Sequence, residues 1–114
     1  MSNIFHIEDE KDFQQQLANA GEKLVVVDFF AMWCGPCQSV NPKLEIIAEK
    51  YSEKIVILKI DTDKCRPLKL KYGIRYVPTF IFFWNGERLD GIVDEANSRK
   101  VENYIEKYLA TTHN

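Results

Sequence analysis

Two cysteines three residues apart, Cys34 and Cys37, have the type and spacing most suited to chemistry in this sequence. Residues three apart in a helical turn have Cα atoms about 5 Å apart, which is within the range that a disulfide spans. Between them, Gly35 tolerates tight backbone geometry, and Pro36 lacks only an N–H that the first turn of a helix leaves unpaired. The segment therefore predicts a pair of thiols that opens and closes a disulfide with little backbone movement.

The two sulfurs are expected to differ in environment. Counting back three residues from Val40 places Cys37 on the buried stripe of a helix, whereas Cys34 precedes the first turn. We therefore expect Cys34 to face solvent at the positive end of the helix dipole, where the thiolate is favoured. Cys37 is expected to be shielded and to keep its proton to higher pH. This asymmetry predicts Cys34 as the attacking sulfur and Cys37 as the resolving one.

Other uses of a cysteine pair fit the sequence less well. A structural zinc site needs four ligands, and only Cys65, His6 and His113 remain, without a second paired motif. Covalent haem attachment would need histidine at the position of Gln38. A structural disulfide closing so short a loop gains little and does not persist in a reducing compartment. We therefore expect a redox pair, no metal, and an unreactive or mildly regulatory thiol at Cys65.

The elements that position the pair follow from hydrophobic patterning and turn residues. Strands are predicted over residues 4–7, 24–30, 55–60, 79–84 and 87–93, and helices over 9–20, 34–51, 67–72 and about 101–109. Asn85-Gly86 indicates a type I′ hairpin between the last two strands. The order βαβαβαββα predicts one α/β domain over residues 1–114, a central mixed sheet flanked by helices on both faces. Cys34 then falls at the carboxyl end of a strand, where such folds place reactive sites.

Composition and charge exclude several classes of protein. The chain has 114 residues, of which 46% are hydrophobic, unlike a disordered protein. A net charge of −2 with intermixed signs indicates no surface for nucleic acid or anionic lipid. No apolar run approaches the roughly 18 residues of a membrane span, and the first 13 residues carry charges where a secretory signal is apolar. We expect a soluble, cytoplasmic protein.

Several segments together resemble the thioredoxin family. They are Val27-Asp28-Phe29, Trp33-Cys34-Gly35-Pro36-Cys37, Lys59-Ile60-Asp61, Val77-Pro78-Thr79-Phe80, and Asn85-Gly86 with Gly91. The match runs in register over nearly the whole chain, and residues 59–80 look most like animal thioredoxins. Two positions beside the pair depart from the family: Gln38 stands where Lys or Arg is usual, and Met32 where a small or polar residue is common.

The resemblance implies a thioredoxin-like three-layer sandwich and a protein-disulfide reductase that donates electrons to disulfide-containing targets. It also implies that thioredoxin reductase regenerates the dithiol with NADPH, so that the chain itself, a monomer, needs no bound cofactor. Two alternatives stay open at this point. One is a disulfide oxidase or isomerase, and the other is a non-catalytic module that binds a partner in one redox state.

Asp28 and Lys59 are the expected supporting residues. An acid in the middle of a buried apolar strand should have a raised pKa. By resemblance, Asp28 is the proton acceptor for Cys37, and Lys59 lies near it and tunes its charge. The alternatives are an Asp28–Lys59 pair that serves structure alone, and a Lys59 side chain whose head simply reaches water.

A substrate groove is also implied by the resemblance. Val77-Pro78 looks like a cis peptide facing the cysteine pair, although an X–Pro bond is by itself expected to be trans. The backbone of Val77 would pair with an extended target strand. The expected groove residues are Trp33, Gly35, Pro36, Val77, Pro78, Gly91 and Ile92. The alternative for Trp33 is a place in the core.

Overall fold

The computed structural model describes residues 2–111, and its elements follow the predicted order. They are β1 (Ile4–His6), α1 (Glu10–Asn19), β2 (Leu24–Phe30), α2 (Gly35–Lys50), β3 (Ile55–Asp61), α3 (Arg66–Lys71), β4 (Thr79–Trp84), β5 (Glu87–Val93) and α4 (Ser98–Thr111). Three of the five strands have the predicted bounds. Most other ends differ by one residue, and α4 extends further than its apolar stripe indicated.

The five strands form one mixed sheet in the order β1-β3-β2-β4-β5. The first three of these are mutually parallel, whereas β4 is antiparallel to both β2 and β5. Asn85 and Gly86 have φ values of 52° and 79°, which are the two positive φ angles of a type I′ turn. This turn brings Trp84 opposite Glu87. The mixed sheet and its terminal hairpin are confirmed.

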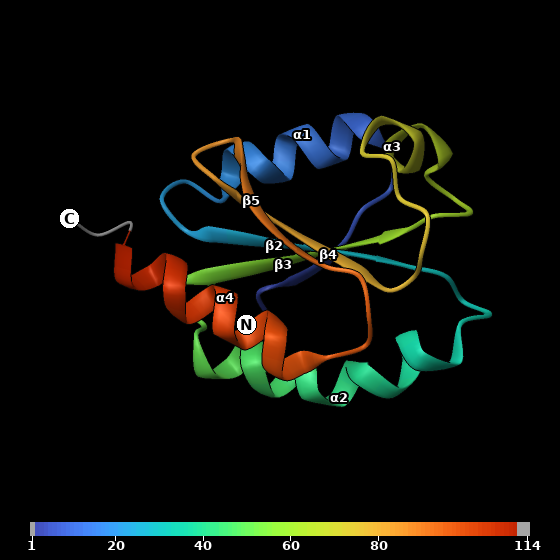
Figure 1. The fold of residues 1–114 in the computed structure, drawn as a ribbon. Helices are drawn as coiled ribbons and strands as arrows, with labels where there is room; N and C mark the ends of the chain where they lie inside the picture. Colours follow the sequence, from blue (N-terminus) through green and yellow to red (C-terminus); the bar gives the residue numbers. More distant parts are fainter. Residues whose placement is uncertain (1, 112–114) are drawn as a thin grey trace.

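Helices cover both faces of the sheet, which gives the predicted three layers (Figure 1). Side chains from α1 and α3 pack on one face, where Phe13 and Leu68 join a core with alternate residues of β2, β3 and β4. On the other face, α2 and α4 contribute Leu44 and Ile105 to a second core. The central strand β2 is buried along its whole length. Such a strand needs apolar residues on both faces, which explains its near-continuous apolar sequence.

The cysteine pair lies where β2 gives way to α2. After β2 ends at Phe30, residues 31–34 lead directly into the helix. Cys34 is the N-cap residue with extended backbone, and Pro36 occupies the first turn, where its missing N–H costs nothing. The structure thus places the pair at the carboxyl end of a central strand, as predicted.

Candidate active site

Cys34 and Cys37 form a disulfide with their Cα atoms 5.3 Å apart. The sulfur of Cys34 also takes the role of a capping side chain, because the backbone N–H of Cys37 donates to it over 3.1 Å. The first turn of α2 carries no acidic residue. The partial positive charge of the helix terminus is therefore directed at Cys34 without an opposing carboxylate nearby in the turn.

The expected difference in exposure between the two cysteines is wrong for this disulfide state. Cys34 is 4% exposed and Cys37 is 2% exposed. Both cysteines pack with Phe30 and Ala31, and Val77, in the loop before β4, packs against this cluster. The capping contact turns the Cys34 sulfur inward. The two sulfurs therefore differ in their position along the helix, and not in how much of their surface meets solvent.

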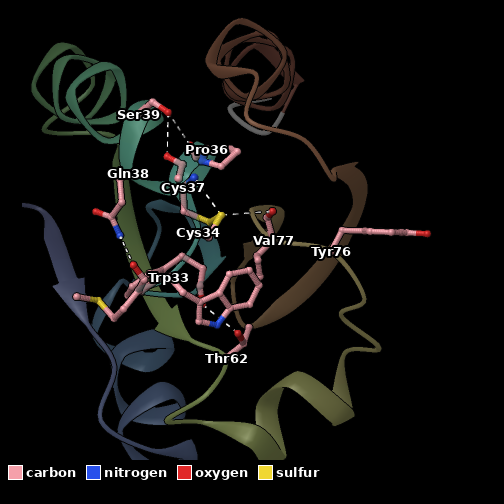
Figure 2. The surroundings of a disulfide bond; sticks show 12 residues. Trp33, Cys34, Pro36, Cys37, Gln38, Ser39, Thr62, Tyr76 and Val77 are labelled. Carbon is pink, nitrogen blue, oxygen red and sulfur yellow. Dashed lines mark hydrogen bonds between the residues drawn. A yellow bond between two sulfur atoms is a disulfide. The ribbon is translucent and has the colours of Figure 1, made fainter.

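Several residues next to the buried disulfide are exposed. Trp33 is 73% exposed, so the alternative that it belongs to the core is wrong. Its indole N–H donates to Asp63 Oδ2 over 2.9 Å, which fixes the ring beside the pair. Gly35 and Pro36 are exposed in the first turn of α2. Figure 2 shows Trp33 and Val77 near the sulfurs, with Tyr76 directed away from them.

The Val77-Pro78 peptide is cis, as the family resemblance implied. The carbonyl oxygen of Val77 lies 3.6 Å from the Cys34 sulfur (Figure 2). Val77 is half-buried, whereas Pro78 is buried. The loop before β4 is thereby brought against the start of α2, although 43 residues separate Val77 from Cys34.

Gly91 and Ile92 do not extend this surface in the way the sequence suggested. Gly91 is buried, and its N–H donates to the Tyr108 hydroxyl over 2.7 Å. A Cβ on Gly91 would lie 2.6 Å from that oxygen and 2.8 Å from the Tyr104 ring. Gly91 is therefore required by close packing of β5 against α4. Ile92 is exposed and pairs with Ile81, whose side chain belongs to the core beneath α1 and α3. Ile92 therefore lies on the face of the sheet opposite α2.

Asp28 is buried in the centre of β2 and lies beside Lys59 of β3. The Lys59 ammonium is 3.5 Å from Asp28 Oδ2. Asp28 Oδ1 accepts no hydrogen bond from the residues that the structure describes. Burial raises the pKa of Asp28 to about 6, and the nearby positive charge of Lys59 opposes part of that rise. The expected raised pKa and the expected proximity of Lys59 are both present.

The Lys59 side chain has two further contacts that the sequence analysis missed. Its ammonium donates to Asn41 Oδ1 over 2.5 Å and lies 5.0 Å from the centre of the Phe30 ring. Asn41 follows Cys37 by four residues, so the two share one face of α2. This spacing is the sequence feature that could have indicated Asn41 as a residue of the site. Asp63, the partner of Trp33, lies in a loop, where no periodic pattern marks it.

The third cysteine lies outside this site. Cys65 is buried before α3, with its sulfur 3.7 Å from the Ile7 carbonyl oxygen and 3.6 Å from that of Glu8. Burial raises the pKa of its thiol, which disfavours a reactive thiolate, in keeping with the expected unreactive role. Of the other residues weighed as zinc ligands, His6 lies in β1 and His113 lies outside the described residues.

Comparison with known proteins decides the family. The family model described as Thioredoxin matches residues 4–107. The chain belongs to the thioredoxin family. It is 42% identical to thioredoxin from Bos taurus over 106 residues, which cover 93% of this chain and 99% of that one. It is 38% identical to Thioredoxin-T from Drosophila melanogaster, over 92% of this chain and 66% of the longer relative.

Solved structures give the same result. The Schistosoma mansoni thioredoxin structure superposes with a TM-score of 0.86 and 39% identity, over 95% of this chain and 99% of that one. The thioredoxin fold is therefore shown by sequence and by structure. The disulfide between Cys34 and Cys37 is the redox-active centre of a protein-disulfide oxidoreductase, and its targets are disulfide-containing proteins.

Proposed function

We propose that the chain reduces target disulfides with Cys34 as the attacking sulfur. In the reduced protein, the Cys34 thiolate attacks one sulfur of the target disulfide, and the other target sulfur leaves as a thiolate. Cys37 then loses its proton to Asp28 and attacks the Cys34 sulfur. This forms the Cys34–Cys37 disulfide and releases the second target thiolate. The target gains two electrons and the chain loses two.

The observation that carries this assignment is the position of the two sulfurs on α2. Cys34 caps the helix, and its sulfur accepts the N–H of Cys37. A thiolate there gains from the same N–H and from the helix dipole. Cys37 lies inside the first turn, on the face that meets the sheet. Its position supports a thiol that reacts only after the mixed disulfide forms.

Asp28 is proposed as the proton acceptor because it shares a buried region with Cys37. Val26, two residues before Asp28, belongs to the core that α2 and α4 cover, and alternation along β2 turns the Asp28 side chain to the same face. Lys59 joins Asp28 to Asn41, which lies one turn beyond Cys37. A carboxyl with a pKa of about 6 is ionised at neutral pH and is a stronger base than an ordinary aspartate.

A target segment is proposed to bind in extended form across the surface between Trp33 and Val77. Val77 precedes β4, so its backbone lies outside the ladders of the sheet. Added strands bind through such main-chain groups. Gly35 and Pro36 present little side-chain bulk beside the disulfide, which allows close approach of a target sulfur. The groove proposed here excludes Gly91, which α4 covers.

Regeneration and location complete the proposal. We propose that thioredoxin reductase returns the disulfide to the dithiol with electrons from NADPH, and that the chain itself binds no cofactor. We further propose that the protein works in the cytoplasm as a monomer. Its residues 1–114 are proposed to form a single domain. The helices within residues 2–111 are too short or too polar to cross a membrane. The family membership and the redox pair support the reductase as partner.

Insulin reduction tests the activity. With dithiothreitol as electron source, the chain is expected to accelerate the appearance of turbidity from reduced insulin, and Cys34→Ser is expected to abolish the acceleration. A chain that binds insulin without accelerating its reduction would instead be a binding module.

Oxidation of NADPH by thioredoxin reductase in the presence of the chain and insulin tests the proposed partner. If no NADPH is oxidised, the reductase is not the partner.

A further inference from the structure

Asn41 is placed to control how closely the Lys59 ammonium approaches Asp28. The ammonium is 2.5 Å from Asn41 Oδ1 but 3.5 Å from Asp28 Oδ2. A charge-assisted N–H···O⁻ bond is usually about 2.7–2.9 Å long. The cation is therefore bound more closely by the neutral amide than by the carboxylate, even though the carboxylate is buried and Coulomb attraction favours contact.

The neighbours of Asn41 on α2 favour the orientation in which its oxygen faces Lys59. Its nitrogen donates to Gln38 Oε1 over 3.5 Å, and the Gln38 amide donates to the Met32 carbonyl over 3.4 Å. The three bonds run in one direction, from the ammonium through two amides to the backbone before Trp33. Both amide bonds are longer than the usual range of about 2.7–3.2 Å, so the bond from Lys59 is the strong one of the three.

The surroundings leave Lys59 room for another position. Asn41, Gln38 and Lys59 border a cavity of about 390 Å³ together with residues of three other segments. Lys59 rests against the Phe30 ring on one side. Although the Lys59 side chain is mostly buried, the adjoining cavity allows its ammonium to shift, so its distance from Asp28 depends on which acceptors hold it.

Other titratable or charged groups near Lys59 come from several elements. His6 is its register partner in β1, and His6, Asp61 and Lys64 all border the same cavity. From β4, Phe80 faces Asp28 in the register and carries no charge. The sulfurs of Cys34 and Cys37 are held in the disulfide and do not titrate in this state. Substitution of Asn41 leaves all of these groups in place.

We propose that Asn41 is a positioning residue for the resolving step, and that its oxygen holds the Lys59 ammonium back from full contact with Asp28 so that the carboxylate remains a competent proton acceptor. The inference rests on the proposed role of Asp28. It involves no redox change of its own, because the only transfer affected is the proton that passes from the Cys37 thiol to Asp28. Asn41 itself contacts neither the two sulfurs nor the target.

Two substitutions at Asn41 should move the Asp28 titration in opposite directions. Asn41→Leu removes the neutral acceptor, so the ammonium closes on Asp28 and the pKa of Asp28 falls. Asn41→Asp adds a negative charge that draws the ammonium away, so the pKa of Asp28 rises. Carbon-13 NMR of the Asp28 carboxyl in the oxidised protein measures its pKa in each variant. At pH 5 we expect the ionised fraction to change about threefold, upward for Asn41→Leu and downward for Asn41→Asp.

Controls separate this inference from the proposed function. Asn103→Leu makes the same chemical change on the exposed face of α4 and should leave the Asp28 titration unchanged. An unchanged titration in both Asn41 variants, or shifts in the same direction, would overturn the positioning role. The pH profile for resolution of a preformed mixed disulfide should move with the titration. If the titration shifts while Asp28→Asn resolves at the wild-type rate, the proposed role of Asp28 fails instead.

Discussion

At Asp28, burial and the Lys59 charge act on the same carboxyl in opposite directions. Burial is the larger influence, and the pKa settles near 6, above the ordinary value of 3.8. Between these two values the folded protein binds a proton that the unfolded chain has released. Stability should therefore fall as the pH rises from about 4 to about 6, and change little from this cause above pH 6.

Asp28→Asn should accordingly stabilise the protein at neutral pH. The rise from 3.8 to about 6, which already includes the attraction to Lys59, corresponds to about 3 kcal/mol of destabilisation by the ionised carboxyl at pH 7. Urea unfolding from pH 4 to pH 8 measures the gain, which should shrink toward pH 4. Glu87→Gln, at an exposed acid, is the control. A gain independent of pH would contradict a raised pKa in the folded state.

The same variant should resolve mixed disulfides more slowly. Without a carboxylate, Cys37 must lose its proton to water or to buffer, and loss of a general base typically costs 10²–10⁴-fold in rate. Rapid-quench measurement on a preformed mixed disulfide with a small aromatic thiol isolates this step. Resolution at the wild-type rate would exclude Asp28 as the proton acceptor, while leaving the redox role of the cysteines intact.

At the scale of elements, the contact between β5 and α4 depends on a missing side chain. Gly91→Ala would place a Cβ 2.6 Å from the Tyr108 hydroxyl, which also donates to Asp90 over 2.8 Å. Relieving this overlap should destabilise the protein by about 1–3 kcal/mol. Thermal unfolding measures the effect. Gly35→Ala is the matched control, because nothing lies within 4 Å of its added Cβ. Equal melting temperatures for the two variants would contradict the packing role of Gly91.

Sequence patterns predicted the elements well because each depends on local information. The apolar run of β2, the proline at the start of α2 and the Asn85-Gly86 turn each determine their own segment. The groove was predicted less well. Gly91 matched the family by residue type, but the packing of β5 against α4, which no single sequence reveals, places Tyr108 and Tyr104 against it.

Contacts between distant elements were also beyond the sequence. The exposure of Cys34 depends on how Val77 packs from the loop before β4 and on which way the capping sulfur turns. Neither is a property of the helix alone. Asn41 could be placed on the face of Cys37 by its spacing, whereas its contact with Lys59 required the packing of α2 on the sheet.

For the whole molecule, the two cores are expected to unfold together. They lie on opposite faces of one sheet and share β2, β3 and β4. The two tryptophans report on different regions: Trp33 lies beside the disulfide, and the Trp84 indole donates to the Glu22 carbonyl. Trp33→Phe and Trp84→Phe each leave one reporter. Each reporter should give the same urea midpoint as circular dichroism of the same variant. Separate midpoints would contradict the proposed single domain.

Trapping the mixed disulfide tests the central claim most directly, namely that Cys34 attacks and Cys37 resolves. Reduced Cys37→Ser and Cys34→Ser proteins, each with Cys65→Ser to remove the third thiol, are incubated with a disulfide-containing peptide and analysed by intact mass after acid quench. We expect a covalent adduct to accumulate on Cys37→Ser and to be nearly absent from Cys34→Ser. Equal adduct formation on both proteins, or a preference for the Cys34→Ser protein, would contradict these roles of the two cysteines.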